Sequence, residues 1–109
     1  MEIERLHEML LAAGIEHDWV DRRLRVYDVY GKLMPDLFPE GEDRGWQIVV
    51  YYPDGERMIS AIEGWGTYGF KDDLIEIMGL LTPEEAEHDS VIGWLTAEDV
   101  FERIKKEIK

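Results

Sequence analysis

The sequence predicts an α+β fold, in which a small antiparallel sheet is packed by helices. Two runs rich in β-branched and aromatic residues, 46–52 and 57–63, flank the turn Pro53-Asp54-Gly55, as is typical of an antiparallel hairpin. Apolar residues recur at helical spacing near both ends of the chain. The 109 residues, 45% of them hydrophobic, are enough for one core, so we expect a single domain over 1–109.

An N-terminal helix is expected over residues 2–13. Ile3, Leu6 and Leu10 recur at 3.6-residue spacing and would form its buried face. Gly14 favours the end of this helix, because glycine readily takes the left-handed conformation that follows a last turn.

The segment 17–30 precedes the hairpin and has two interpretations. Its alternating pattern and its Trp, Val and Tyr residues favour a strand, although Val20, Leu24 and Tyr27 also fit a helical stripe. We expect extended structure here. The following residues, 31–44, contain two prolines, two glycines and four acids, and this composition predicts a long surface loop.

Helical segments and an apolar bridge are predicted after the hairpin. Asp72 is a candidate N-cap for a helix over 73–81. Thr82 is followed by a first-turn proline and a reciprocal glutamate, and Thr96 begins a last helix in a similar way. Residues 91–95 form a bridge that is either a short strand or a tucked loop. The expected element order is α-β-β-β-α-α, with a central hairpin and helices mostly on one face of the sheet.

The charge of the chain limits its partners. Its 25 acidic and 12 basic residues give a formal net charge of −13, which repels nucleic acid and anionic membranes and attracts basic proteins. Cysteine is absent, which excludes disulfides and thiolate chemistry. The acidic N-terminal stretch does not resemble a signal peptide, and no segment approaches the ~20 apolar residues of a membrane span. We therefore expect a cytoplasmic protein that contacts neither nucleic acid nor membrane directly.

The acidic residues are concentrated in one region. Residues 72–102 contain ten carboxylates and no lysine or arginine. Carboxylates along helices can imitate the charge row of a nucleic acid duplex, so a basic host protein is the expected partner. Ordinary solvated helix faces are the alternative interpretation of the same charges. The candidate partner-binding residues are Asp72, Asp73, Glu76, Glu84, Glu85, Glu87 and Asp89.

A small anionic ligand, such as a nucleotide signal, is an alternative target. Arginine binds phosphate through two parallel hydrogen bonds, and aromatic rings stack on bases. Glycine-flanked aromatics in the loop after the hairpin would supply such rings. A solvated strand face is the simpler interpretation of the arginines, and a homo-oligomer is also an open alternative. The candidate ligand-binding residues are Trp19, Arg22, Arg23, Arg25, Trp65 and Tyr68.

Residues 64–69 match the pattern G-x-G-x-x-G of dinucleotide-binding loops. The preceding strand belongs to an antiparallel hairpin, however, and the spacer residues are the bulky Trp65, Thr67 and Tyr68. Asp72 and Asp73 would also repel a phosphate at this position. We therefore expect no dinucleotide and no other cofactor. No catalytic residues or metal ligands are assigned, and a small enzyme of unknown class is the last alternative.

Several stretches of the chain resemble a known group of proteins. These are GWQIVVYYPDGERMISAIEG, DLIEIMGLLTPEE and DSVIGWLTAEDVFERI, which together cover roughly residues 45–104. The chain resembles small acidic accessory proteins of phages and prophages of gut Firmicutes. The resemblance implies a phage accessory role, for example inhibition of a host defence protein, and it supplies no catalytic residues.

Overall fold

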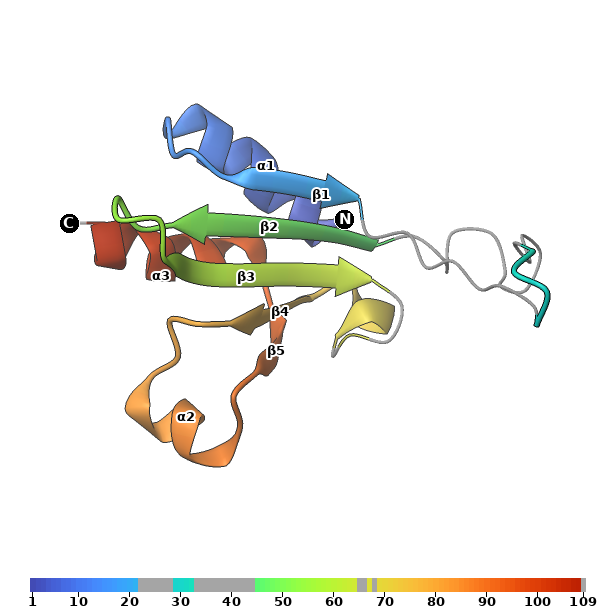
Figure 1. Cartoon of the computed structure of the whole chain (residues 1–109). Coiled ribbons are helices and arrows are strands. Elements are labelled where there is room, and N and C mark those ends of the chain that lie inside the picture. Colours follow the sequence, from blue (N-terminus) through green and yellow to red (C-terminus); the bar gives the residue numbers. More distant parts are fainter. Residues whose placement is uncertain (22–28, 33–44, 65–66, 68, 109) are drawn as a thin grey trace.

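The computed structural model describes residues 1–21, 29–32, 45–64, 67 and 69–108. Its helices and strands follow one another along the chain, with a short 3-10 helix, η1, after the hairpin (Figure 1). In order, they are α1 (Glu2–Ala12), β1 (Asp18–Asp21), β2 (Gly45–Tyr51), β3 (Arg57–Gly64), η1 (Phe70–Asp72), β4 (Ile75–Met78), α2 (Pro83–His88), β5 (Ile92–Leu95) and α3 (Ala97–Ile108).

The strands form a five-stranded antiparallel sheet in the order β1-β2-β3-β4-β5. Ile48 of β2 lies opposite Ala61 of β3, and Ala61 lies opposite Ile77 of β4. Their side chains therefore point to the same face of the sheet. The structure confirms the α+β class and the central hairpin.

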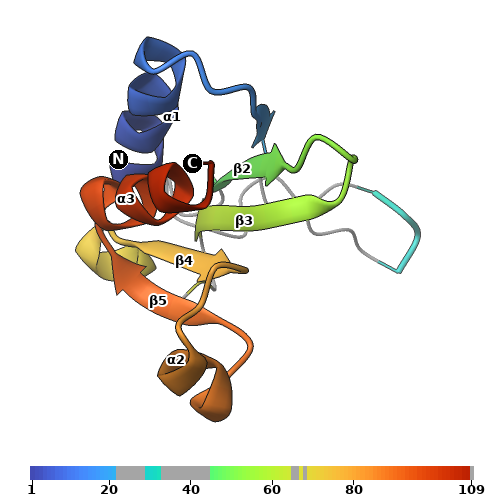
Figure 2. The same ribbon diagram turned by 90° about the vertical axis from the view of Figure 1, so that its left-hand side faces the viewer.

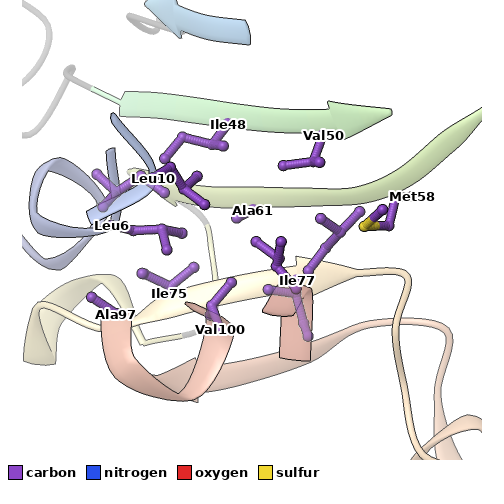
Figure 3. Close-up of a cluster of buried hydrophobic side chains, with 13 residues drawn as sticks. Leu6, Leu10, Ile48, Val50, Met58, Ala61, Ile75, Ile77, Ala97 and Val100 are labelled. Atoms are coloured by element: carbon purple, nitrogen blue, oxygen red, sulfur yellow. The ribbon is translucent and has the colours of Figure 1, made fainter. Parts of the chain in front are cut away.

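Helices α1 and α3 cover one face of the sheet (Figure 2). Figure 3 shows Leu6 and Leu10 of α1 and Val100 of α3 among the side chains of strand residues such as Ile75. The buried hydrophobic cluster consists of Ile3, Leu6, Leu10, Ile48, Val50, Met58, Ile59, Ala61, Ile75, Ile77, Ala97, Val100 and Ile104. Burial of these side chains is the main stabilising contribution to the fold.

The prediction of a helix over 73–81 is wrong. This part of the chain is a turn at Asp73, the strand β4 and a second turn at Gly79. Ile75 and Ile77 are fully buried whereas Met78 is half-exposed, which is the alternation of a strand with one covered face. Hydrogen bonding to β3 on one side and β5 on the other satisfies the backbone of β4. The expected order α-β-β-β-α-α therefore lacked the strand β4, whereas β5 is the short strand that was one of the two alternatives for 91–95.

Local sequence signals correctly placed α1, α2 and α3. Helix α1 ends at Ala12, and Gly14 has φ of +71° just beyond it. Thr82 makes the predicted capping box at the start of α2. At the start of α3, the Thr96 hydroxyl accepts a hydrogen bond from the backbone N–H of Asp99 at 3.2 Å.

Two sequence predictions are only partly tested. The extended structure expected over 17–30 is confirmed for β1, whereas residues 22–28 lie outside the described residues. Most of the loop expected over 31–44 also lies outside them. Among the described helices, none combines the length and the apolar character that a bilayer crossing requires.

Candidate functional site

The acidic helix α2 is held in place by Arg103 of α3. The Arg103 guanidinium donates two hydrogen bonds to the Glu85 carboxylate, at 2.7 and 2.8 Å, and one to the backbone carbonyl of Leu80 at 3.0 Å. Glu85 also accepts a hydrogen bond from the backbone N–H of Thr82. Arg103 and these hydrogen bonds lower the pKa of Glu85 to about 2. Glu85 therefore fixes α2 and is not free to bind a partner.

The remaining carboxylates of α2 face solvent. In α2, all of whose residues are described, no residue is buried. Glu84 and Glu87 are exposed, and so is Asp89 directly after the helix. Figure 1 shows α2 projecting away from the sheet below β4 and β5. The result is a short acidic helix that is anchored at one residue and accessible around most of its surface.

Asp72 and Asp73 lie at the opposite end of β4. Asp73 accepts a hydrogen bond from the backbone N–H of Glu2 at 2.9 Å. Glu63 accepts one from the backbone N–H of Ile3 at 3.0 Å, so two carboxyl groups cap the N-terminus of α1. Asp73 thus has a structural role at the helix N-terminus, and Asp72 is exposed beside it.

Glu63 and Asp73 share a hydrogen bond. Glu63 is 1% exposed, and burial and the neighbouring Asp73 raise its pKa to about 8, so it is protonated at neutral pH. The same hydrogen bond lowers the pKa of Asp73, which is ionised. The pair therefore shares one proton and places one negative charge at the positive end of the α1 dipole.

The seven predicted partner-binding residues do not form one surface. Glu84, Glu85, Glu87 and Asp89 lie on and directly after α2, whereas Asp72 and Asp73 lie at the other end of β4. Glu76 lies in β4 between them, opposite Ile62 of β3 and half-buried.

Trp19 is the one predicted ligand-binding residue that the structure describes. Its ring stacks on the His7 ring with centroids 4.4 Å apart, and on the Trp46 ring with centroids 4.6 Å apart. It therefore joins α1 to the sheet as the middle ring of a three-ring stack. Arg22, Arg23, Arg25, Trp65 and Tyr68 lie outside the described residues.

His7 and His17 form a pair that the sequence did not predict. His7 Nδ1 lies 2.7 Å from His17 Nε2, and His17 Nδ1 lies 2.8 Å from the carbonyl of Ile15. Because a carbonyl can only accept, His17 Nδ1 carries a proton, and in the neutral pair His7 Nδ1 donates to His17 Nε2. Burial and the nearby His17 lower the pKa of His7, with an opposing effect of Glu8. His7 is therefore neutral at physiological pH.

A signal for Glu63 was present in the sequence. Glu63 follows Ile59 and Ala61 at two-residue spacing, so it lies on the core-facing side of β3. A carboxyl group at such a position requires hydrogen-bonding partners inside the protein. The histidine pair had no comparable signal, because it depends on how α1 packs beside β1.

Comparisons with protein-family models, curated proteins and solved structures find no match to the chain. Within the described residues, no group of three or more His, Cys, Asp or Glu side chains is arranged to hold a metal ion. The function is therefore inferred from the charges and surfaces of the molecule itself.

Replacing Arg103 tests the anchoring of α2. Arg103→Met should lower the free energy of unfolding by about 1–2 kcal/mol near neutral pH, because Glu85 and the Leu80 carbonyl lose a partly buried partner. The stabilisation is present above pH 4.5, the ordinary pKa of the Glu85 carboxyl, and is lost as pH falls towards about 2. Urea unfolding at several pH values measures the difference.

Lys106→Met is the matched control, since Lys106 is exposed on the same helix. It should change stability by less than about 0.5 kcal/mol. An equal loss in both variants would show that Arg103 does not hold α2.

Proposed function

We propose that the protein is a non-catalytic binding protein that engages a basic protein through α2. The observation that carries this proposal is that α2 buries none of its residues, yet is fixed by the pair between Glu85 and Arg103. The exposed carboxylates of Glu84 and Glu87 are thus presented on a positioned helix. A positioned charge loses less side-chain and loop freedom on binding than a mobile one.

The overall charge supports the same proposal. A formal net charge of −13 speeds encounter with a basic partner and disfavours acidic ones. Close to α2, Arg103 is neutralised by its pair with Glu85. The exposed Lys106 of α3 lines the same surface hollow as Thr82, but the carboxylates of Asp99, Glu102 and Glu107 also line it, so the surface beside α2 stays acidic.

The resemblance to phage accessory proteins supports a narrower version of the proposal. The partner would be a basic nucleic-acid-binding protein of a host cell, such as a defence nuclease, and the acidic surface would take the place of nucleic acid. The contact is assigned to α2 and Asp89 and not to all of 72–102, because Asp72 and Asp73 lie at the far end of β4. In this version the protein acts in the host cytoplasm.

Charge reversal on α2 tests the proposal. The immobilised protein is used to capture partners from a lysate of the bacterial host, and the affinity of the purified partner is then measured over a salt series. Glu84→Lys with Glu87→Lys should weaken binding at least about tenfold, and wild-type affinity should fall steeply with salt. Glu85 is left unchanged because its loss would disturb the anchoring of α2.

Glu4→Lys with Glu8→Lys is the matched control, since both residues are exposed on α1 and the net charge changes equally. This variant should lose much less affinity than the α2 variant. Equal losses, or an affinity that does not depend on salt, would contradict a contact through α2. For the narrower version, a DNA duplex should compete with the protein for the partner.

A further inference from the structure

The molecule has an open groove of about 1020 Å³. It is bordered by the C-terminal part of α1, the segment leading into β1, the turn between β2 and β3, and the end of α3. Its size is close to the upper limit of about 1,000 Å³ for small-molecule sites, and it is open to solvent, so a peptide segment can reach it.

Apolar side chains line much of this groove. Leu11 of α1 is 60% exposed and Ile108 of α3 is 49% exposed, and Ile15 is partly buried, whereas Val50 and Met58 border the groove as buried core residues. Tyr51 adds a half-exposed aromatic ring. An exposed leucine next to other apolar groups favours a ligand with hydrocarbon parts.

The charged groups of the groove all have one sign. Glu16, Asp18 and Glu107 line it, and no lysine or arginine is among the described lining residues. The Tyr52 hydroxyl donates a hydrogen bond to Glu107 at 2.6 Å and so positions this carboxylate. A positively charged ligand would complement these three carboxylates.

The histidine pair adds another acceptor. His7 lines the groove, and its Nδ1 donates to His17 in the neutral pair. In neutral His7 the proton is therefore on Nδ1 and not on Nε2. A neutral Nε2 accepts hydrogen bonds. The groove thus combines hydrogen-bond acceptors with apolar side chains.

We propose that this groove binds an extended basic segment of the protein partner. The lysine or arginine heads of the segment contact Glu16, Asp18 and Glu107, and their hydrocarbon stems and neighbouring apolar residues lie on Leu11 and Ile15. The inference rests on the proposed function, because it assigns a second contact to the same basic partner. The groove is a surface separate from α2.

A labelled peptide tests the groove directly. The probe is a fluorescein-labelled peptide of alternating lysine and leucine, and its binding to the full chain is followed by fluorescence anisotropy. Glu16→Gln with Asp18→Asn should raise Kd about tenfold, because two charge-assisted contacts are lost. Glu4→Gln with Glu102→Gln removes the same charge at exposed positions outside both the groove and α2, and should change Kd by less than about twofold. Equal effects of the two variants would overturn the proposal.

A second variant and two further probes complete the test. Leu11→Lys keeps an exposed helical position in a good helix former but places a cation in the groove, so binding should be lost while the melting temperature is kept. The same peptide with every lysine acetylated should not bind. Spermine should bind far more weakly than the peptide, and equal affinity would overturn a peptide as the occupant in favour of a free polyamine.

The two proposals can fail independently. If the peptide does not bind but charge reversal on α2 abolishes capture of the partner, the groove inference fails and the proposed function stands. If the peptide binds in the groove but α2 reversal leaves the partner's affinity unchanged, the assignment of function to α2 fails.

Discussion

Glu63→Gln should stabilise the protein strongly above neutral pH and leave it nearly unchanged at about pH 5. Folding raises the pKa of Glu63 from 4.5 to about 8, so the folded state retains a proton that the unfolded chain has lost. The contribution of Glu63 to the free energy of unfolding is therefore fully present below pH 4.5 and is lost as pH rises through about 8. Between pH 4.5 and about 8, each pH unit changes the free energy of unfolding by about 1.4 kcal/mol, so the total effect is on the order of several kcal/mol.

The amide introduced by Glu63→Gln retains the contacts of the protonated acid. Its oxygen can accept from the backbone N–H of Ile3, and its NH₂ group can donate to Asp73 in place of the shared proton. It has no proton to lose, so the stability of this variant should depend less on pH between about 5 and 9 than that of the wild type.

Urea unfolding at pH values from about 5 to 9 measures the effect. The difference between variant and wild type should grow with pH and level off above about 8. Glu56→Gln is the control, because Glu56 is exposed in the hairpin turn. Its difference from wild type should be small and flat. A flat difference for Glu63→Gln as well would show that Glu63 is ionised in the folded protein.

The parts of the fold that were predicted correctly depend on local signals. Gly14 marks the end of α1, the capping box of Thr82 and Glu85 begins α2, and the Pro-Asp-Gly turn defines the hairpin. Each of these signals involves residues only a few positions apart. Their physical causes, a positive φ or a satisfied backbone N–H, act independently of the rest of the chain.

Strand β4 was missed because its stability comes from distant partners. The stretch 73–81 has apolar residues that suit a short helix. In the structure, however, Ile75 and Ile77 each lie opposite a residue of β5, and Ile77 also lies opposite Ala61 of β3. Tertiary packing overrides weak local preference in such short segments. Because this segment is a strand that begins after a turn at Asp73, the Asp73 carboxylate lies at the N-terminus of α1.

The acidic composition of the candidate site could be predicted from the sequence, but the spatial arrangement of its residues could not. The acidity of 72–102 was evident, yet the sequence could not show that Glu85 is bound by Arg103, since 18 residues separate them. For the same reason, Glu84 and Glu87 could not be distinguished from Glu85 as accessible charges. The groove is formed by segments from both ends of the chain, so its lining depends on the tertiary fold.

Gly79→Ala should destabilise the protein by about 3 kcal/mol or more. Gly79 has φ of +100°, and a Cβ atom at this position would lie 2.5 Å from the backbone carbonyl oxygen of Met58. A backbone atom cannot rotate away as a side chain can, so β4 and β3 would have to separate locally. Met58 is part of the buried cluster, and a shift there would disturb the core itself.

Gly55→Ala separates the steric effect from the effect of the positive φ. Gly55 has a similar φ of +92°, but a Cβ atom there would meet nothing within 4 Å. This variant should lose only about 1–2 kcal/mol, the usual penalty of a left-handed conformation for alanine. Urea unfolding of both variants measures the two losses. Equal losses would mean that the contact between Gly79 and Met58 relaxes without a penalty, whereas a larger loss for Gly79→Ala places the close approach of β3 and the β4 turn among the determinants of the fold.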